Sequence, residues 1–334
     1  RIAPSQVYGL GRRRAVHLPI VPAPPRSAYD AIMYPIQRVS RSEFVPIRRL
    51  NYHVRLWGHP GPGTPPLVLL HGWMDVAASF QFMVDTMARE RFIIAPDWRG
   101  FGLTASGGAD CFWWPDYLAD LDALLDHYVA DQTIDLVGHS MGGNVAMLYA
   151  GVRPARIRHL INLEGFGMPA TRPSQAPGRL THWLDELQKS RLGATRLKPY
   201  PSLDAVADRL TKNNPRLTRD KALWLAGHWA VEHRPGEWTI LGEPAHKIVN
   251  AQLYNVDEVL AVHRQISAPT LMVEASHNEI AKWWQDQLTL TEHHERLKVV
   301  TQLERVTLPD CGHMLHHDQP QALAELIENF LAPT

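Results

Sequence analysis

The sequence predicts an α/β fold, in which a mostly parallel sheet carries helices on both faces and one helical insertion. Short apolar runs, typical of strands buried on both faces, alternate with stretches whose apolar residues recur at helical spacing. This alternation favours a parallel sheet, because consecutive parallel strands need a crossover that is usually a helix. Between about residues 168 and 261 the alternation lapses and tryptophan-rich helical patterns replace it, which indicates an insertion.

The expected strands share a short apolar centre bounded by turn residues. In chain order they cover residues 44–47, 52–57, 67–70, 92–95, 134–137, 160–163, 270–273 and 305–308. The expected helices share apolar residues three or four positions apart. In the core they lie around residues 80–87, 116–128, 145–150 and 322–331, and in the insertion around 180–187 and 222–229.

The charge of the chain is balanced. Its 334 residues include 34 Lys and Arg against 34 Asp and Glu, so the formal net charge is zero. A neutral chain has no long-range field that would gather nucleic acid or an anionic membrane surface. We therefore expect a small-molecule substrate as the partner, no nucleic acid and no membrane, with a homodimer left open.

Three sequence features bear on location. Cys111 and Cys311 lie far apart and make no disulfide framework, which favours a reducing compartment. No apolar run reaches the roughly 18 residues of a membrane span. The basic residues 12–14 are followed by several prolines and make a poor signal peptide. We expect a cytoplasmic protein whose residues 1–42 form an irregular arm.

The segment Gly138-His139-Ser140-Met141-Gly142 matches the G-x-S-x-G pattern of a nucleophile elbow. The pattern alone is weak, but here an apolar strand leads into it and a helix leads out, which is the context that the chemistry requires. A tight strand-to-helix turn would project the hydroxyl of Ser140 above the sheet. The helix N-terminus beneath it would favour a developing oxyanion. We predict that Ser140 is the nucleophile.

Two further segments fit the same site. His71-Gly72-Trp73 follows the strand at 67–70, so the backbone N–H of Trp73, with that of Met141, would form an oxyanion hole. His313 lies in a loop after the last strand and before the last helix, where a general base would reach the elbow. We predict His313 as the base and take His316 and His317 as surface or loop-packing residues.

The order of these motifs resembles the α/β-hydrolase superfamily, in particular capped members related to epoxide hydrolases, haloperoxidase-like esterases and serine-hydrolase-like proteins. The resemblance implies an eight-stranded sheet, with a core at residues 43–167 and 262–334 and a helical cap at 168–261. Dehalogenases and epoxide hydrolases of this superfamily use a carboxylate nucleophile. Because this chain has Ser140 at that position, we expect neither of these two activities. The motifs that carry the resemblance are His71-Gly72-Trp73, Asp97-Trp98-Arg99-Gly100-Phe101-Gly102, Gly138-His139-Ser140-Met141-Gly142 and Gly312-His313.

The third member of the triad stays open in the sequence. A carboxylate must accept a hydrogen bond from His313 to hold its tautomer and stabilise the imidazolium. The usual family position follows the strand at 270–273, where the acid would fall on Asn278 or Glu279, with Glu274 as a further choice. Some members place it after the sixth strand, where this chain has Glu164. We predict Glu164, with Glu279 as the alternate acid.

No other motif points to a cofactor. Two loose G-x-G-x-x-A matches, at 100–105 and 165–170, do not open a helix in a first βαβ unit, so dinucleotide binding is set aside. The histidine pairs at 293–294 and 316–317 lack partners at ligand spacing, and we expect no metal. The sequence thus predicts a hydrolase of carboxylic esters that uses an acyl-enzyme. A C–C bond hydrolase acting on a β-diketone or ring-cleavage product, and a ligand receptor on the same fold, are the alternatives.

Overall fold

The computed structural model describes residues 33–61 and 63–332. Most of the arm expected at residues 1–42 lies outside the described residues. The first strand begins at Arg41, two residues before the expected start of the core, because its antiparallel pairing with the second strand runs to Leu56.

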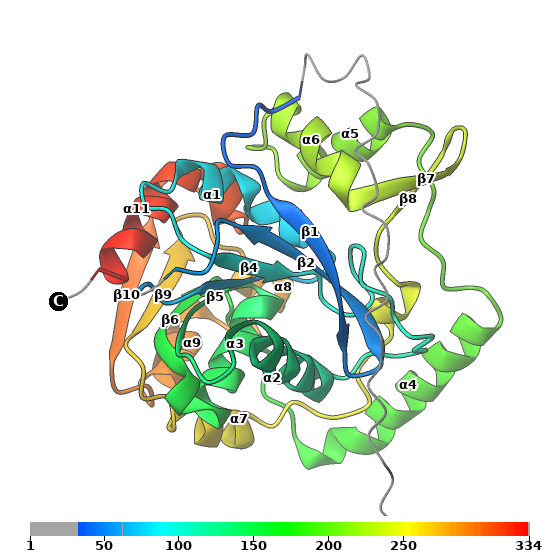
Figure 1. Ribbon diagram of the computed structural model, residues 1–334. Helices are drawn as coiled ribbons and strands as arrows, with labels where there is room; N and C mark the ends of the chain where they lie inside the picture. Colours follow the sequence, from blue (N-terminus) through cyan, green and yellow to red (C-terminus); the bar gives the residue numbers. More distant parts are fainter. Residues whose placement is uncertain (1–32, 62, 333–334) are drawn as a thin grey trace, which may run out of the picture. The chain divides into compact units, whose positions relative to one another are not determined.

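One sheet of eight strands forms the centre of the fold (Figure 1). The strands follow the order β1-β2-β4-β3-β5-β6-β9-β10; β1–β2 and β2–β4 pair antiparallel and the remaining neighbours pair parallel. The α/β class and the mostly parallel sheet expected from the sequence are confirmed. The strands are β1 (Arg41–Ile47), β2 (Leu50–Trp57), β3 (Leu67–Leu70), β4 (Ile93–Pro96), β5 (Ile134–His139), β6 (Ile157–Leu163), β9 (Thr270–Ala275) and β10 (Leu303–Leu308).

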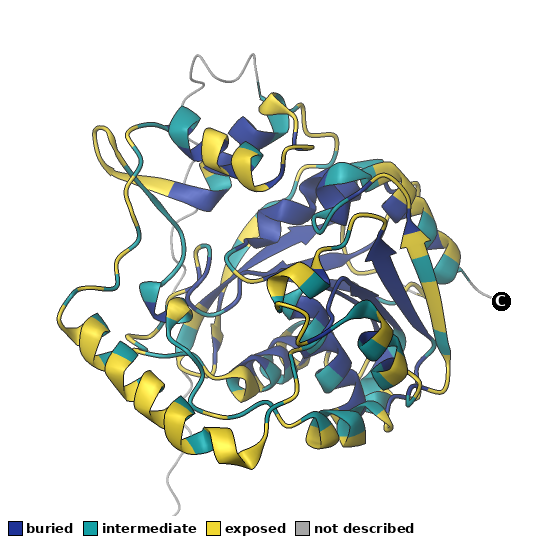
Figure 2. Cartoon of the chain, turned by 180° about the vertical axis from the view of Figure 1, so that it is seen from behind, coloured by how far each residue is buried: buried dark blue, intermediate teal, exposed yellow. Residues whose placement is uncertain are grey.

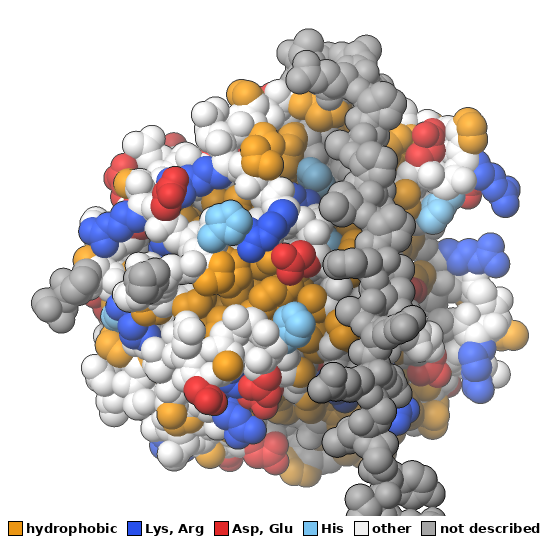
Figure 3. Space-filling view, in the orientation of Figure 1, with side chains coloured by type: hydrophobic (Ala, Val, Ile, Leu, Met, Phe, Trp, Pro, Cys, Tyr) orange, Lys and Arg blue, Asp and Glu red, His pale blue; other side chains and the backbone are white. Residues whose placement is uncertain are grey.

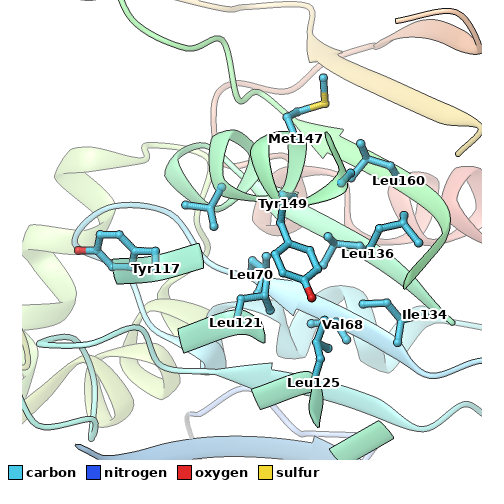
Figure 4. Close-up of a cluster of buried hydrophobic side chains, with 14 of the residues drawn as sticks. Val68, Leu70, Tyr117, Leu121, Leu125, Ile134, Leu136, Met147, Tyr149 and Leu160 are labelled. Atoms are coloured by element: carbon cyan, nitrogen blue, oxygen red, sulfur yellow. The ribbon is translucent and has the colours of Figure 1, made fainter. Parts of the chain in front are cut away.

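Helices pack against both faces of this sheet. The helices α2 (Trp114–Val129) and α3 (Met141–Val152) cover one face, and α1 (Gln81–Thr86) and α11 (Pro320–Phe330) cover the other. Because side chains alternate along a strand, β3 sends Val68 and Leu70 into the first layer and Leu67 and Leu69 into the second. Figure 4 shows part of the first layer, where Leu121, Leu125 and Tyr149 lie among strand residues. Each fully buried side chain of this size contributes about 1.5–3 kcal/mol.

Several short helices lie in the loops that connect strands or in the insertion. They are the 3₁₀ helices η1 (Ala77–Phe80), η2 (Pro154–Arg156), η3 (Pro173–Gln175) and η4 (Pro244–Lys247), and the α-helices α8 (Ile280–Trp283), α9 (Leu290–Leu297) and α10 (Leu315–Asp318).

The insertion after β6 is more varied than the helical cap expected from the sequence. It contains α4 (Ala176–Arg191), α5 (Leu203–Asn213), α6 (Arg219–Trp229) and α7 (Val256–His263), and also a hairpin of β7 (Ala230–Arg234) and β8 (Glu237–Ile240). α4 has no buried residue and stands out as an exposed helix in Figure 2. α7 packs on α3, so the expected cap boundary at residue 261 falls inside a helix that belongs with the core.

Cys111 and Cys311 are both free thiols. Within residues 33–61 and 63–332, we find no helix that has both the length and the apolar character needed to cross a membrane. On the face shown in Figure 3, hydrophobic side chains are exposed between charged ones.

Candidate active site

Ser140 occupies a sharp turn between β5 and α3. Its φ of 52° lies in the left-handed region, which a residue with a side chain rarely adopts, so this turn is strained. Glycines make the turn sterically feasible. A Cβ on Gly138 would collide with the carbonyl oxygen of Gly142, and one on Gly142 would collide with that of Leu70. The glycine spacing noted in the sequence therefore has a packing cause: backbone approaches backbone on both sides of Ser140.

The loop after β3 lies directly beside this turn. A Cβ on Gly72 would come within 3.2 Å of the Ser140 Cβ. The N–H of Trp73 has no hydrogen-bond partner among the described residues, and the N–H of Met141 is at the first position of α3, where amides lack an intrahelical acceptor. The loop that carries Trp73 thus lies against the turn of Ser140, and Met141 follows Ser140 directly.

His71 holds this loop in place. Its Nε2 accepts the Trp98 N–H at 2.9 Å, and the indole Nε1–H of Trp98 donates to the His71 carbonyl at 3.0 Å. Nδ1 therefore carries the proton and donates to the Gly72 carbonyl at 2.8 Å. Burial lowers the pKa of His71 to about 4, so this ring stays neutral and stabilises the loop through its hydrogen bonds.

Glu164 is the carboxylate that lies against His313. Its Oε2 is 3.3 Å from His313 Nδ1, and its Oε1 accepts the backbone N–H of Ala275 at 2.7 Å. Glu164 also has a positive φ of 56°, which turns its side chain from the end of β6 toward the end of β9. Asn162 stabilises that turn, since its side chain bonds both the N–H and the carbonyl of Gly165 at 2.9 Å.

The alternate acids lie elsewhere. Glu279 is exposed at the start of α8 and pairs with Lys282 at 2.6 Å. Glu274 pairs with His294 Nε2 at 2.7 Å. Among the three carboxylates weighed from the sequence, only Glu164 is within hydrogen-bonding range of His313 in the described structure.

Burial disfavours charge on both members of the Glu164–His313 pair. It raises the pKa of Glu164 to about 8. The hydrogen bond from the Ala275 N–H lowers this pKa in part, and the negative charge of Glu274 raises it further. Burial lowers the pKa of His313 to about 4, against a weaker opposite effect of Glu279. The imidazole is therefore unprotonated near neutral pH, which is the form that can accept a proton from Ser140.

His139, the residue before Ser140, connects the elbow to the loop that carries His313 by a hydrogen bond. Its Nε2 donates to the carbonyl of His313 at 2.8 Å, and the two rings lie 4.7 Å apart. Asp318 holds the other side of the loop by accepting the Gly312 N–H at 2.8 Å. No hydrogen bond joins Ser140 Oγ to His313 among the described residues; such contacts often tighten only when substrate binds.

A buried polar cluster behind the elbow was not expected from the sequence. His316 and His317 are buried, so of the two placements expected, at the surface or packed in the loop, the surface one is wrong; α10 packs them against η1. Their Nε2 atoms lie 3.0 and 2.6 Å from the hydroxyl of Ser79. Asp75 lies 3.9 Å from His316. The sequence signal was only the His-His pair, since its partners lie more than 200 positions away.

A cavity of about 560 Å³ opens beside the elbow. Its wall includes Trp73 and Met141, the residues whose amides flank Ser140, and is mostly apolar. Ser140 and His313 themselves are not among the described residues that line it. The cavity lies between α2 and α3 on one side and the segments that enter and leave the insertion on the other. Its apolar members include Tyr117, Leu148, Phe166 and Tyr254.

Comparisons of sequence and of structure with known proteins point to the same family. A family model described as alpha/beta hydrolase fold matches residues 65–320. A serine hydrolase-like protein of Danio rerio is 25% identical over 313 residues, covering 89% of this chain and 90% of its own. A 2-hydroxy-6-oxo-2,4-heptadienoate hydrolase of Pseudomonas putida is 32% identical, but over only 31% of this chain and 38% of its own. The thioesterase domain from the curacin biosynthetic pathway shares the fold with a TM-score of 0.74, at 24% identity over 87% of this chain and 99% of its own.

Proposed function

The chain belongs to the alpha/beta hydrolase fold family, and on that premise we propose that it is a serine hydrolase. The proposed reaction is cleavage of a carboxylic ester of a small to medium apolar molecule through an acyl-enzyme. Ser140 is the nucleophile, His313 the general base and Glu164 the acid. The observation that carries the proposal is the hydrogen-bonding distance of 3.3 Å between His313 and Glu164, beside an elbow whose serine has a positive φ.

In the first step, Ser140 Oγ forms a bond to the carbonyl carbon while its proton passes to His313 Nε2. The π electrons of the carbonyl move to the oxygen, which receives hydrogen bonds from the N–H groups of Trp73 and Met141. Glu164 accepts the Nδ1–H of the new imidazolium and stabilises its charge. Because this charge exists only on the way to the tetrahedral intermediate, the Glu164 interaction lowers the barrier rather than the energy of the bound substrate.

In the second step the tetrahedral intermediate collapses. The bond to the leaving oxygen breaks, and that oxygen takes the proton from His313, so the alcohol departs and an acyl-Ser140 remains. Water then attacks the acyl carbon as His313 accepts one of its protons. In the second collapse the bond to Ser140 Oγ breaks and Oγ takes that proton from His313, which releases the carboxylic acid and restores both residues. No cofactor is required for this sequence.

The cavity of about 560 Å³ supports the choice of an apolar substrate. Its mostly apolar wall includes Trp73 and Met141, whose N–H groups are the proposed oxyanion donors, so an acyl or alcohol chain bound there would lie beside the elbow. Burying such a chain contributes about 0.8 kcal/mol for each methylene. This gain supports a preference for medium-length chains over acetate.

Hydrolysis of a C–C bond in a β-diketone or ring-cleavage product is the second candidate. The same nucleophile, base and acid would serve it. The partial match to the 2-hydroxy-6-oxo-2,4-heptadienoate hydrolase of Pseudomonas putida favours it. Because that match spans about a third of each chain, ester cleavage stays the first proposal.

Hydrolysis of p-nitrophenyl esters of increasing acyl length tests the proposal. We expect Ser140→Ala to lower kcat/KM by about 10³-fold or more, and Glu164→Gln by on the order of 10²- to 10⁴-fold. Glu279→Gln is the matched control, since it removes a nearby but exposed carboxylate; it should stay within about twofold of the parent.

Four outcomes would count against this scheme. Full activity in Ser140→Ala would remove the nucleophile, and loss confined to Glu279→Gln would move the acid. Turnover of a β-diketone by a folded parent that cleaves no ester would put C–C hydrolysis first. Ligand binding without any turnover would favour a receptor role.

A further inference from the structure

We propose that Asp75, His139 and His316 bind one divalent transition-metal ion, such as Zn²⁺, behind the nucleophile elbow. Each of these residues offers one ligand atom, and the three atoms lie within 4.8 Å of one another. All three residues are more than nine-tenths buried. They come from the loop after β3, the end of β5 and α10, so only the folded chain brings them together.

His139 is oriented as a metal ligand would be. Its Nε2 must carry the proton, because its partner is the His313 carbonyl, which can only accept. Nδ1 therefore has a free lone pair, and it has no partner among the described residues. A metal-bound histidine characteristically donates its second ring N–H to a carbonyl or carboxylate, which fixes the ring and its tautomer.

His316 and Asp75 supply the other two ligand atoms. The Nε2 of His316 lies 3.9 Å from Asp75 Oδ2 and 3.0 Å from the Ser79 hydroxyl, so a bound ion would replace the contact with Ser79. One carboxylate oxygen of Asp75, Oδ2, is buried and has no hydrogen-bond partner among the described residues. Buried polar atoms are nearly always satisfied, so the two unpaired acceptors His139 Nδ1 and Asp75 Oδ2 are unusual, and a single cation would satisfy both.

The donor set selects the class of ion. Two imidazole nitrogens and one carboxylate oxygen suit Zn²⁺ and its first-row neighbours, and three protein ligands leave a fourth position open. Ca²⁺ and Mg²⁺ are poor candidates, because they take six or more oxygen ligands or keep several waters. The expected absence of a metal rested on sequence spacing, which cannot show residues brought together from three separate segments.

The cluster adjoins the reacting groups. A Cβ on Gly72 would lie 3.0 Å from His139 Nδ1 and 3.2 Å from Ser140 Cβ, so the free nitrogen faces the loop that flanks the nucleophile. The His139 ring is also 4.7 Å from that of His313. A bound ion would add positive charge near the position where His313 becomes an imidazolium. We therefore expect the ion to slow hydrolysis, a consequence that rests on the proposed function, whereas binding of the ion does not.

The test uses the full chain after chelator treatment and dialysis. Titration with Zn²⁺ by calorimetry should give one tight equivalent, and Co²⁺ should give the visible absorption of a low-coordinate nitrogen–oxygen site. Asp75→Asn keeps the shape of the side chain and should weaken binding at least about tenfold, as should His316→Asn. His293→Asn is the matched control, because His293 is also buried but contacts Phe166 instead; its affinity should equal that of the parent.

Either of two results overturns the proposal: no equivalent of Zn²⁺ bound by a folded parent, or equal affinity in the parent and Asp75→Asn, which would assign binding to other histidines. Circular dichroism establishes that each variant is folded, and Asp75→Asn decides the matter where His316→Asn does not fold. Failure of the proposed hydrolase function is seen separately, as a parent that binds Zn²⁺ but whose metal-free form cleaves no ester.

Discussion

Ser140, Glu164 and Met74 share a backbone conformation that residues with side chains rarely adopt. Their φ angles are 52°, 56° and 55°, and all three lie where loops meet at the carboxyl edge of the sheet. Conformations of this kind cost about 1–3 kcal/mol each and persist where the surrounding packing overrides them. Among the described residues, three of the eight non-glycine residues with a positive φ are thus those to which the proposed chemistry assigns the nucleophile, the acid and the oxyanion loop.

The raised pKa of Glu164 predicts an alkaline rise in activity. Below about pH 8 the carboxyl group holds a proton, and above it the carboxylate can stabilise the imidazolium of His313, while Glu274 nearby favours the protonated form. We expect kcat/KM to rise on the order of tenfold between about pH 6.5 and 9. Ester hydrolysis read at the isosbestic wavelength of nitrophenol measures it.

Glu164→Gln is the control for this pH profile, since glutamine keeps the shape and cannot titrate. Its activity should be low and flat across the same range. A rise of equal size in Glu164→Gln would assign the titration to another group.

At the scale of elements, β5 combines an apolar pattern with one buried charge. Asp135 is fully buried in this central strand and is neutralised by Arg91 and Arg158, each at 2.5 Å; His159 Nδ1 lies 3.1 Å from the same carboxylate. The strand was predicted from its apolar neighbours alone. The arginines that make the aspartate tolerable come from the segment before β4 and from β6, so the strand depends on its neighbours for electrostatic balance.

Removing that charge should destabilise the sheet. Asp135→Asn leaves Arg91 and Arg158 without a full counter-charge, and we expect the free energy of unfolding to fall by about 3–5 kcal/mol. Urea denaturation followed by circular dichroism measures this. Asp126→Asn is the control, because Asp126 is 68% exposed in its pair with Arg156 and should cost at most about 1 kcal/mol. Equal losses in both variants would contradict the account of β5.

At the scale of the whole described chain, the cavity is formed jointly by the core and the insertion. Leu148 of α3 lines it, and so do Phe166 and Tyr254 from the two ends of the insertion. Neither part encloses this space by itself. Substrate size is therefore set by how the insertion packs on the core.

Filling the cavity should change chain-length preference. Leu148→Trp adds bulk to the wall, and we expect the ratio of octanoyl to acetyl ester turnover to drop on the order of tenfold, since several methylenes lose their burial. The comparison is made on kcat/KM with both esters. Val152→Trp, on the same helix but 47% exposed, should leave the ratio unchanged. An unchanged ratio in Leu148→Trp would place the acyl chain elsewhere.

The elements that the sequence predicted well are those with a strong local pattern. Every expected strand of the core lies within or next to an observed strand, and the helices after β5 and before the C-terminus match α3 and α11. The hairpin β7–β8 was missed because Glu232 and Glu237 interrupt any apolar alternation, and its turn depends on Gly236 at a φ of 77°. The cytoplasmic location stays a prediction.

The sequence by itself determined what is encoded locally: the order of strands and helices, the elbow around Ser140 and the loop that carries His313. Only the tertiary structure decided which carboxylate meets His313, because Glu164 is 149 positions away from it. It also decided that His316 is buried beside Asp75 and His139, and that a cavity adjoins the elbow. Hydrophobic periodicity shows which face of an element is buried, whereas side-chain contacts between distant segments depend on how the elements pack in three dimensions.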